Sequence, residues 1–299
     1  MLVTGTTTTA PATGSIDCSG GCSYQIQVNQ VWSQEPNGYN RTAEVKVPPT
    51  NSKLPVVIDL HGNGGNANVN RLGFLRKSII VAPQGYERSW NILKEASKAP
   101  DVNFIDSLIK EISKIQQADM DAVNIVGTSN GAGMIMRLLI ELKNPRPFKR
   151  VIPLVSHMLQ DQYHDGDFWM PTNDDNGAIN NFDQKVTPDS PGPEILYYHG
   201  TADGAVPYEG GRGVLGMMFL GAQATTFAFA KAFGFNGAQI ADNAGIEVQS
   251  GVTKYEYNGA SRVVHYKMLD MPHNAFAPIY RDYMHASLIS AIEGINIKG

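Results

Sequence analysis

The chain has 299 residues, and 24 Lys and Arg against 28 Asp and Glu give it a net charge of −4 at pH 7. With 42% apolar and 17% charged residues, it can build a large core and lacks the charge that keeps chains disordered. Without runs of Lys or Arg it is a poor partner for nucleic acid, whose phosphates attract clustered cations.

The first 22 residues are rich in Thr, Ala, Pro and Gly and predict a flexible lead-in. They contain neither the cationic nor the apolar region of a signal peptide. Cys18 and Cys22 form either a short disulfide or two free thiols, and the sequence leaves both open. A disulfide would favour secretion, and zinc is disfavoured because a second cysteine pair is missing.

Two kinds of strand follow. Residues 24–29 and 43–47 alternate apolar and polar side chains, which is typical of antiparallel strands with one wet face. Later strands are short, nearly continuous apolar runs, which indicates a parallel sheet buried on both faces. These runs are 56–60, 79–82, 123–126, 151–155, 195–198 and 263–269.

Helical patterns lie between and after these runs, at 101–115, 132–142, 222–233 and 277–293. Asp101 is the expected N-cap of the first, and Asn144-Pro145 should stop the second. Strand–helix alternation predicts a doubly wound α/β fold with helices on both faces. We expect one catalytic domain over 23–299, monomeric, with lid-like insertions at about 157–193 and 204–223. The uncharged run 213–230 contains glycines and threonines, so we interpret it as loop and helix rather than a membrane span.

One motif carries chemistry. Gly127-Thr-Ser129-Asn-Gly131 directly follows a predicted strand and precedes a helix, which is the context of the G-x-S-x-G nucleophile elbow. Glycines two residues either side of Ser129 let neighbouring backbone come close. The helix start directs its N–H groups at developing negative charge. The alternative is an ordinary Gly-rich turn.

The partners of such a serine come as an acid and then a histidine, each after a later strand. Asp203 follows the strand 195–198, and His273 follows the strand 263–269. The sequence therefore predicts the triad Ser129, Asp203 and His273. Four other histidines are interpreted as structural: His61, His199, His265 and His285.

An oxyanion hole should accompany the triad. The segment His61-Gly-Asn63-Gly-Gly65 follows an early strand, where this architecture supplies one backbone N–H. We expect the N–H of Asn63, with Gly64 as the next candidate, and that of Asn130, the residue after the serine. The competing interpretation is a phosphate-binding glycine loop, but neither phosphate-loop spacing occurs.

Five segments occur in the same order in a known family: HGNGG, VAPQGYERSWN, DVNFIDSLI, GTSNGAGM and HGTADGAVPYEGG. Through them, from about Arg41 to Phe276, the chain resembles the polyhydroxybutyrate-depolymerase-like and feruloyl esterases of the α/β-hydrolase superfamily. The resemblance implies the same triad, hydrolysis of carboxylic esters, no cofactor and usually export. It also implies that Trp90 contacts substrate.

The segments that shape the pocket depart from the family. The catalytic histidine follows Met271-Pro272, and the insertion at 157–193 looks long. Trp169 in that insertion is a candidate for stacking on an aromatic acyl group, or simply anchors its loop. Feruloyl or other aryl esters and polyesters, including hydroxyalkanoate and aromatic ones, are the expected substrates, with acetylated carbohydrates as the alternative.

Three features point weakly to other functions. His157, Asp161, His164, Asp165 and Asp167 are possible metal ligands, but their spacing matches no known site, so a solvated loop is favoured and no metal is expected. A hydrolase fold without turnover would be a binding protein, although its expected broken triad is absent. Leu2-Val-Thr-Gly5 superficially suggests a nucleotide enzyme but lacks a second glycine at dinucleotide spacing.

Overall fold

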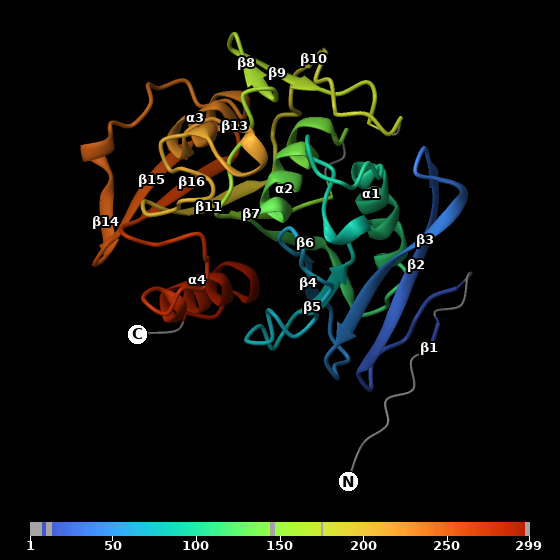
Figure 1. Cartoon of the computed structure of the whole chain (residues 1–299). Helices are drawn as coiled ribbons and strands as arrows, with labels where there is room; N and C mark the ends of the chain where they lie inside the picture. The colour runs from blue at the N-terminus through green and yellow to red at the C-terminus, as the bar shows by residue number, and fades with distance from the viewer. Residues whose placement is uncertain (1–7, 10–13, 144–146, 175, 297–299) are drawn as a thin grey trace.

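The structure is a computed structural model that describes residues 8–9, 14–143, 147–174 and 176–296. Its largest element is an eleven-stranded sheet with the order β1-β2-β3-β5-β4-β6-β7-β11-β16-β15-β14 (Figure 1). The strands are β1 (Thr8–Thr9), β2 (Cys22–Trp32), β3 (Glu35–Val47), β4 (Leu54–Leu60), β5 (Ile79–Pro83), β6 (Ala118–Thr128), β7 (Arg150–Leu154), β11 (Glu194–Gly200), β14 (Ile246–Gln249), β15 (Val252–Asn258) and β16 (Arg262–Met268).

Six neighbouring strands, from β5 to β16, run parallel, as the continuous apolar runs predicted. The predicted antiparallel pair is β2 and β3. At the opposite edge, β15 and β14 add two further antiparallel strands that the sequence reading missed. Their side chains are mostly polar or exposed, so they lack the apolar run that marked the other strands.

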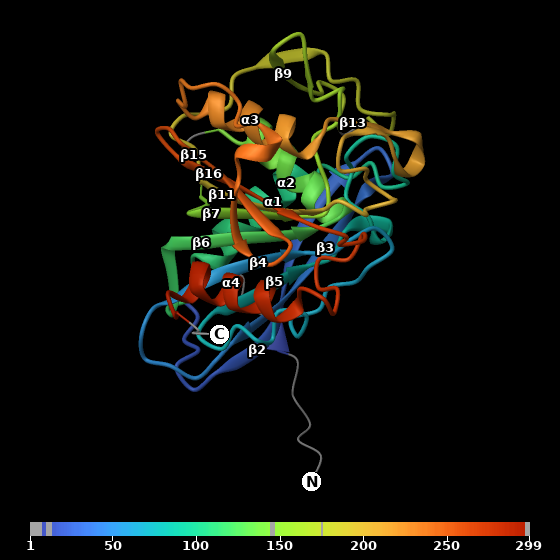
Figure 2. The same ribbon diagram turned by 90° about the vertical axis from the view of Figure 1, so that its left-hand side faces the viewer.

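Helices cover both faces of the sheet (Figures 1 and 2). Three of them, α1 (Asp101–Ile112), α2 (Asn130–Glu141) and α3 (Ala222–Ala232), lie on one face, and α4 (Arg281–Glu293) lies on the other. In β4, Val56 and Ile58 pack into the core beneath the first three helices, while Val57 packs into the core on the side of α4. The predicted doubly wound architecture is therefore confirmed.

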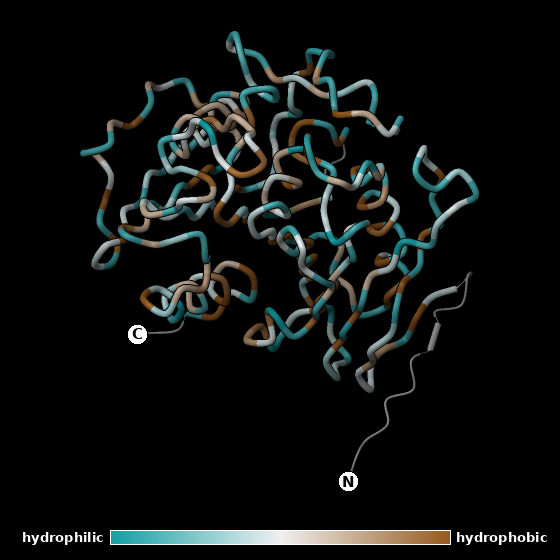
Figure 3. Tube along the Cα trace, in the orientation of Figure 1, coloured by the Kyte–Doolittle hydropathy of each residue, from teal (hydrophilic) through white to brown (hydrophobic). Residues whose placement is uncertain are grey.

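Both predicted insertions contain small elements of their own. The first carries a three-stranded sheet of β8 (Tyr163–His164), β9 (Asp167–Met170) and β10 (Gln184–Val186). The second carries β12 (Gly211–Arg212) and β13 (Met218–Phe219), and Leu159 bridges the two insertions by pairing with Phe219. The tip of the β8–β9 hairpin is hydrophilic (Figure 3), so this hairpin presents polar residues outward. Short 3₁₀ turns occupy Tyr86–Arg88, Val214–Gly216 and Asp242–Ala244.

The expectation that Asp101 caps α1 is wrong. The helix begins at Asp101 itself after Pro100, and the cap makes no side-chain hydrogen bond. The buried carboxylate instead accepts hydrogen bonds from the Arg41 guanidinium (2.6 Å) and the Asn91 N–H (2.7 Å). A buried guanidinium requires an anion in contact with it, so the Asp101 carboxylate pairs with Arg41 and does not cap the helix. The predicted stop of the second helix, at 144–145, lies outside the described residues; α2 ends at Glu141.

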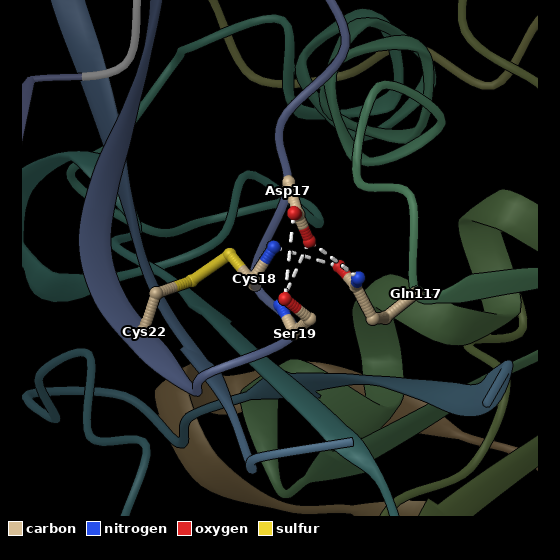
Figure 4. The surroundings of a disulfide bond; sticks show 5 residues. All are labelled: Asp17, Cys18, Ser19, Cys22 and Gln117. Carbon is tan, nitrogen blue, oxygen red and sulfur yellow. Dashed lines mark hydrogen bonds between the residues drawn. A yellow bond between two sulfur atoms is a disulfide. The ribbon is translucent and has the colours of Figure 1, made fainter. Parts of the chain in front are cut away.

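Cys18 and Cys22 form a disulfide (Figure 4). The segment around it is held in place, because the Cys18 N–H donates to the Gln117 side chain (2.8 Å), and Gln117 donates to the Asp17 carboxylate (2.9 Å). Part of the predicted lead-in, including Leu2–Gly5, lies outside the described residues. Within the described part of the chain, no helix is long and apolar enough to cross a bilayer.

Candidate active site

Ser129 sits on a sharp turn between β6 and α2. Its backbone has φ 55° and ψ −117°, a left-handed conformation that is strained for a residue with a side chain. A Cβ at Gly127 would collide with the carbonyl of Gly131, and a Cβ at Gly131 would collide with the carbonyl of Leu60. Glycine is therefore required at both positions, which is the packing expected for a nucleophile elbow.

The structure brings the three predicted triad residues together at the carboxyl edge of the sheet. The Ser129 Oγ lies 2.7 Å from Nε2 of His273. The Nδ1 of the same ring lies 2.7 Å from Oδ2 of Asp203. Asp203 follows β11 and His273 follows β16, and because these strands are parallel neighbours, both loops reach the same edge.

Asp203 is held as a carboxylate. Its Oδ1 accepts the N–H groups of Ala205 and Val206, each at 2.9 Å. Burial alone would raise the pKa of Asp203, but hydrogen bonds from His199, His273 and Val206 outweigh burial and hold that pKa well below its usual range. Charged and aimed at Nδ1, Asp203 keeps a proton on that nitrogen and leaves Nε2 free to accept one from Ser129.

The two expected oxyanion donors lie beside Ser129. Gly62 is so close to it that an added Cβ would touch the Ser129 Cβ at 3.5 Å, which places the following residue, Asn63, at the site. Asn130 opens α2 directly after the serine. Within the described residues, neither the Asn63 N–H nor the Asn130 N–H has a hydrogen-bond acceptor. Both N–H groups are therefore available to an oxygen atom of a ligand.

Trp90 lies behind this loop and does not line the cavity. It is fully buried, and its ring N–H donates to the carbonyl of His61 at 2.8 Å. The Asn130 side chain accepts the Trp90 N–H (2.7 Å) and donates to the Trp90 carbonyl (3.1 Å). Trp90 thus joins the two segments that carry the expected oxyanion donors. The expected contact of Trp90 with substrate is not supported, because the side chain does not line the cavity.

Glu95 is a cavity residue that the sequence reading missed. Its carboxylate accepts the N–H groups of Ile92 (3.1 Å) and Leu93 (2.7 Å) and an amide N–H of Asn130 (3.1 Å). Burial raises the pKa of Glu95, while the backbone N–H groups of Leu93 and Ile92 oppose the rise. It sits in a segment without motif or periodicity, so no signal in the sequence marked it.

A cavity of about 310 Å³ opens at Ser129. Most of its wall is apolar, and much of that wall comes from the 204–223 insertion. The lining residues are Asn63, Ile92, Glu95, Ser129, Asn130, Gly133, Ser156, His157, Leu159, Val206, Val214, Leu215, Met217 and Phe219.

Trp169 does not line this cavity. Its ring stacks on His164 with 4.7 Å between centroids and packs at the edge of the apolar cluster behind the cavity wall.

The candidate metal ligands of the first insertion lie in different surroundings. His157 is fully buried beside Tyr197, while His164 pairs with Asp165 on the exposed β8–β9 hairpin. Asp167 pairs instead with Lys185 (2.6 Å). Across residues 14–143, 147–174 and 176–296, no three His, Cys, Asp or Glu side chains are grouped to hold a metal ion.

No family model matches the sequence, and no curated protein matches it. The specific family suggested by the motifs therefore stays a prediction.

Solved structures do match. An acylaminoacyl peptidase from Pyrococcus horikoshii is 14% identical, with a TM-score of 0.50, over 92% of this chain and 42% of the peptidase. An S-formylglutathione hydrolase from Agrobacterium tumefaciens is 17% identical, with a TM-score of 0.49, over 92% of this chain and 96% of that enzyme. A phospholipase/carboxylesterase from Dyadobacter fermentans is 13% identical, with a TM-score of 0.45, over 81% of this chain and 95% of that one. The α/β-hydrolase fold expected from the sequence is confirmed.

Proposed function

We propose that this chain hydrolyses carboxylic esters through an acyl-enzyme formed on Ser129. The observation that carries the proposal is the pair of 2.7 Å contacts that run from Ser129 through His273 to Asp203. Ser129 lines a cavity together with Asn63 and Asn130, whose backbone N–H groups have no acceptor among the described residues. A nucleophile, its base, the residue that orients the base and a place for an oxyanion are thus adjacent.

In the acylation half, Ser129 Oγ attacks the ester carbonyl carbon while its proton passes to Nε2 of His273. The tetrahedral intermediate carries its negative charge on the former carbonyl oxygen. When the bond to the alcohol breaks, His273 returns the proton to the departing alkoxide, so an alcohol leaves. The acyl group stays on Ser129.

In the second half, His273 takes a proton from a water molecule that attacks the acyl-enzyme, and then protonates Ser129 Oγ as the acid departs. The N–H groups of Asn63 and Asn130 stabilise both intermediates. One such donor is worth about 3 kcal/mol, or roughly 10²–10³ in kcat.

The cavity wall supports an apolar acyl group. Leu159, Met217 and Phe219 are almost fully buried around it, and its volume is at the low end of the range of about 300–1,000 Å³ for ligand pockets. A feruloyl or other aryl group, or one unit of a polyester, would displace water from this wall. An acetyl group would leave most of it uncovered, so acetylated carbohydrates are the weaker candidate.

We also propose that the protein works outside the cytoplasm. The support is the disulfide between Cys18 and Cys22, since such bonds form and persist in oxidising compartments. Secretion of the protein by its source cells, and its absence from their cytoplasmic fraction, would be the supporting result.

Ser129→Ala tests the proposed chemistry. The variant should fold, lose p-nitrophenyl-ester turnover and lose labelling by a fluorophosphonate probe. Ser113→Ala is the matched control, because the Ser113 hydroxyl only caps a carbonyl at the end of α1. Undiminished labelling of Ser129→Ala would refute the proposal, and a wild-type protein without turnover or labelling would favour a binding function.

Substrate class is tested on the wild-type protein by comparing kcat/KM for acetyl, butyryl, hexanoyl and feruloyl esters of one alcohol, and by assaying polyester films. The apolar wall predicts higher kcat/KM for the larger apolar acyl groups. A preference for acetyl esters would overturn the proposed substrate class while leaving the ester chemistry intact.

A further inference from the structure

Behind Asp203 lies a buried cluster of histidine and tyrosine rings that the proposed reaction does not use. His199 stacks on His157 with 4.0 Å between ring centroids, and Tyr197 stacks on His265 at 5.1 Å. All four side chains are at most 1% exposed. Buried polar atoms require hydrogen-bond partners, so the protons in this cluster can be counted.

Two ring nitrogens must carry a proton. The Nε2 of His199 lies 3.0 Å from the Val206 carbonyl and 3.2 Å from Oδ2 of Asp203, and both oxygens only accept. The Nε2 of His157 lies 3.1 Å from the carbonyl of Pro207, which also only accepts. A neutral imidazole has one N–H, so with both Nε2 atoms protonated each Nδ1 would be an acceptor.

The Tyr197 hydroxyl contacts both Nδ1 atoms, that of His199 at 3.0 Å and that of His157 at hydrogen-bond distance. It has a single proton and can donate to only one of them. The other contact is a hydrogen bond only if the ring nitrogen is the donor. If both contacts are hydrogen bonds, one of the two histidines carries protons on both nitrogens and is an imidazolium.

The position of the negative charge decides which histidine this is. Burial of a charge is costly unless an opposite charge is in contact. The Asp203 carboxylate lies beside His199, whereas the two ring nitrogens of His157 face a hydroxyl and a carbonyl, both uncharged. Burial lowers the pKa of His157 well below its ordinary value. His157 is accordingly the neutral ring that accepts the Tyr197 proton.

We propose that His199 is a buried imidazolium that pairs with Asp203 and acts as a positioning residue for His273. The positioning role of His199 rests on the proposed ester hydrolysis, but the positive charge of His199 does not. Asp203 Oδ2 then accepts from two rings, from Nδ1 of His273 at 2.7 Å and from Nε2 of His199 at 3.2 Å. The second ring partly neutralises the carboxylate and so weakens its pull on a proton arriving at His273.

The other groups around His199 do not supply a competing charge in contact with it. From the second insertion comes Tyr208, whose ring centroid lies 6.1 Å away, and from β16 comes His265, for which burial lowers the pKa to about 3. Lys267, the register partner of His199 on β16, pairs with Asp242 at 2.7 Å. Its ammonium lies 5.3 Å from the Tyr208 ring.

The charge can be tested without any turnover. In ¹H–¹⁵N spectra of the wild-type protein labelled at histidine, at pH 8, one imidazolium with two solvent-protected N–H protons should be present. It should be absent from His199→Gln, whose amide can still donate toward Asp203 and accept from Tyr197. A wild-type spectrum without any protected imidazolium would overturn the proposal. That outcome is read from the wild-type protein alone, so it does not depend on whether His199→Gln folds.

The positioning role is tested by the pH profile. His199 and His273 contact the same oxygen, Oδ2 of Asp203. Removing the positive charge of His199 should therefore move the acidic limb of kcat/KM upward by about one pH unit in His199→Gln. Tyr208→Phe is the matched control, because it removes a buried hydroxyl bonded to His265 (2.8 Å) and leaves the His199–Asp203 contact alone. The positioning role would be refuted if the acidic limb of the kcat/KM profile did not move in His199→Gln, or if it moved equally in Tyr208→Phe. A wild-type protein without ester turnover would refute the proposed function, while the spectrum would still decide the charge.

Discussion

His265 offers a quantitative test of how this core responds to acid. It lies in the middle of β16, fully buried between the rings of Tyr197 and Tyr255, and its Nε2 lies 2.8 Å from the Tyr208 hydroxyl. Among the described residues, its Nδ1 has no hydrogen-bond partner. Burial, followed by the positive charge of His199, lowers the pKa of His265 to about 3.

The sign of the effect follows from proton binding in the two states. In the unfolded chain the His265 pKa is about 6.5, so the unfolded state gains a proton as the pH falls through that value and the native state does not. Stability is unaffected above the unfolded pKa, is lost as the pH falls below it, and the loss levels off near the folded pKa. Between pH 8 and pH 5 the loss from this one group is about 2 kcal/mol, or about a 30-fold change in the ratio of folded to unfolded protein.

His265→Phe removes the titrating group while keeping a ring. The variant loses a hydrogen bond at every pH, so only the pH dependence is compared. Urea unfolding at pH 8 and pH 5 should show that the free energy of unfolding falls by about 2 kcal/mol less in the variant than in the wild type. Tyr255→Phe, which alters a ring stacked on His265 without changing the histidine, should retain the wild-type fall. Equal falls in the wild type and His265→Phe would show that His265 is not a buried neutral base.

Three further changes have expected outcomes. Asp203→Asn should preserve the fold but lower kcat/KM for a p-nitrophenyl ester about 10⁴-fold, because His273 loses the carboxylate that selects its tautomer; a loss below tenfold would contradict the assignment. Phe219→Ala removes a nearly buried wall of the cavity and should move the preferred acyl chain toward longer groups in the same ester series, at a measurable cost in thermal stability; an unchanged preference would place the acyl group elsewhere. Replacing Cys18 and Cys22 together by Ser opens a very short loop and should cost about 2 kcal/mol in urea unfolding, with reductant giving the wild-type protein the same value; a variant as stable as the oxidised protein would contradict the stabilising role.

The sheet was predictable where burial dominates. Runs such as Val56–Leu60 are apolar at every residue but one because both faces are covered, and that pattern has few other interpretations. The last two strands of the sheet, β15 and β14, carry no such pattern, because their position is set by pairing with neighbouring strands, which the sequence pattern does not reveal. Asp101 shows the same limit: its partner Arg41 is 60 residues away, and only the folded chain brings the two together.

The convergence of Ser129, Asp203 and His273 was predictable because each residue follows a strand, and parallel strands place such positions at one edge. His199 lies four residues before Asp203, near the end of β11, and the sequence alone indicates a structural role, because a histidine in such a position is compatible with simple packing. The two acceptors near its Nε2, Val206 O and Asp203 Oδ2, distinguish a charged partner of Asp203 from a neutral packing histidine. Neither contact can be predicted from residue spacing.

Trp90 shows why a resemblance transfers position more safely than role. The motif that contains it does contact Asn130, the residue after Ser129, but the Trp90 ring is fully buried, is not among the residues that line the cavity, and donates to the carbonyl of His61. Asn130 then clamps the Trp90 backbone from the other side with two hydrogen bonds. The loop that carries Asn63 and the helix start that carries Asn130 are thereby joined through one buried side chain. An oxyanion hole depends on two N–H groups from separate segments keeping a fixed separation, and a rigid link between those segments serves that need better than a contact to substrate.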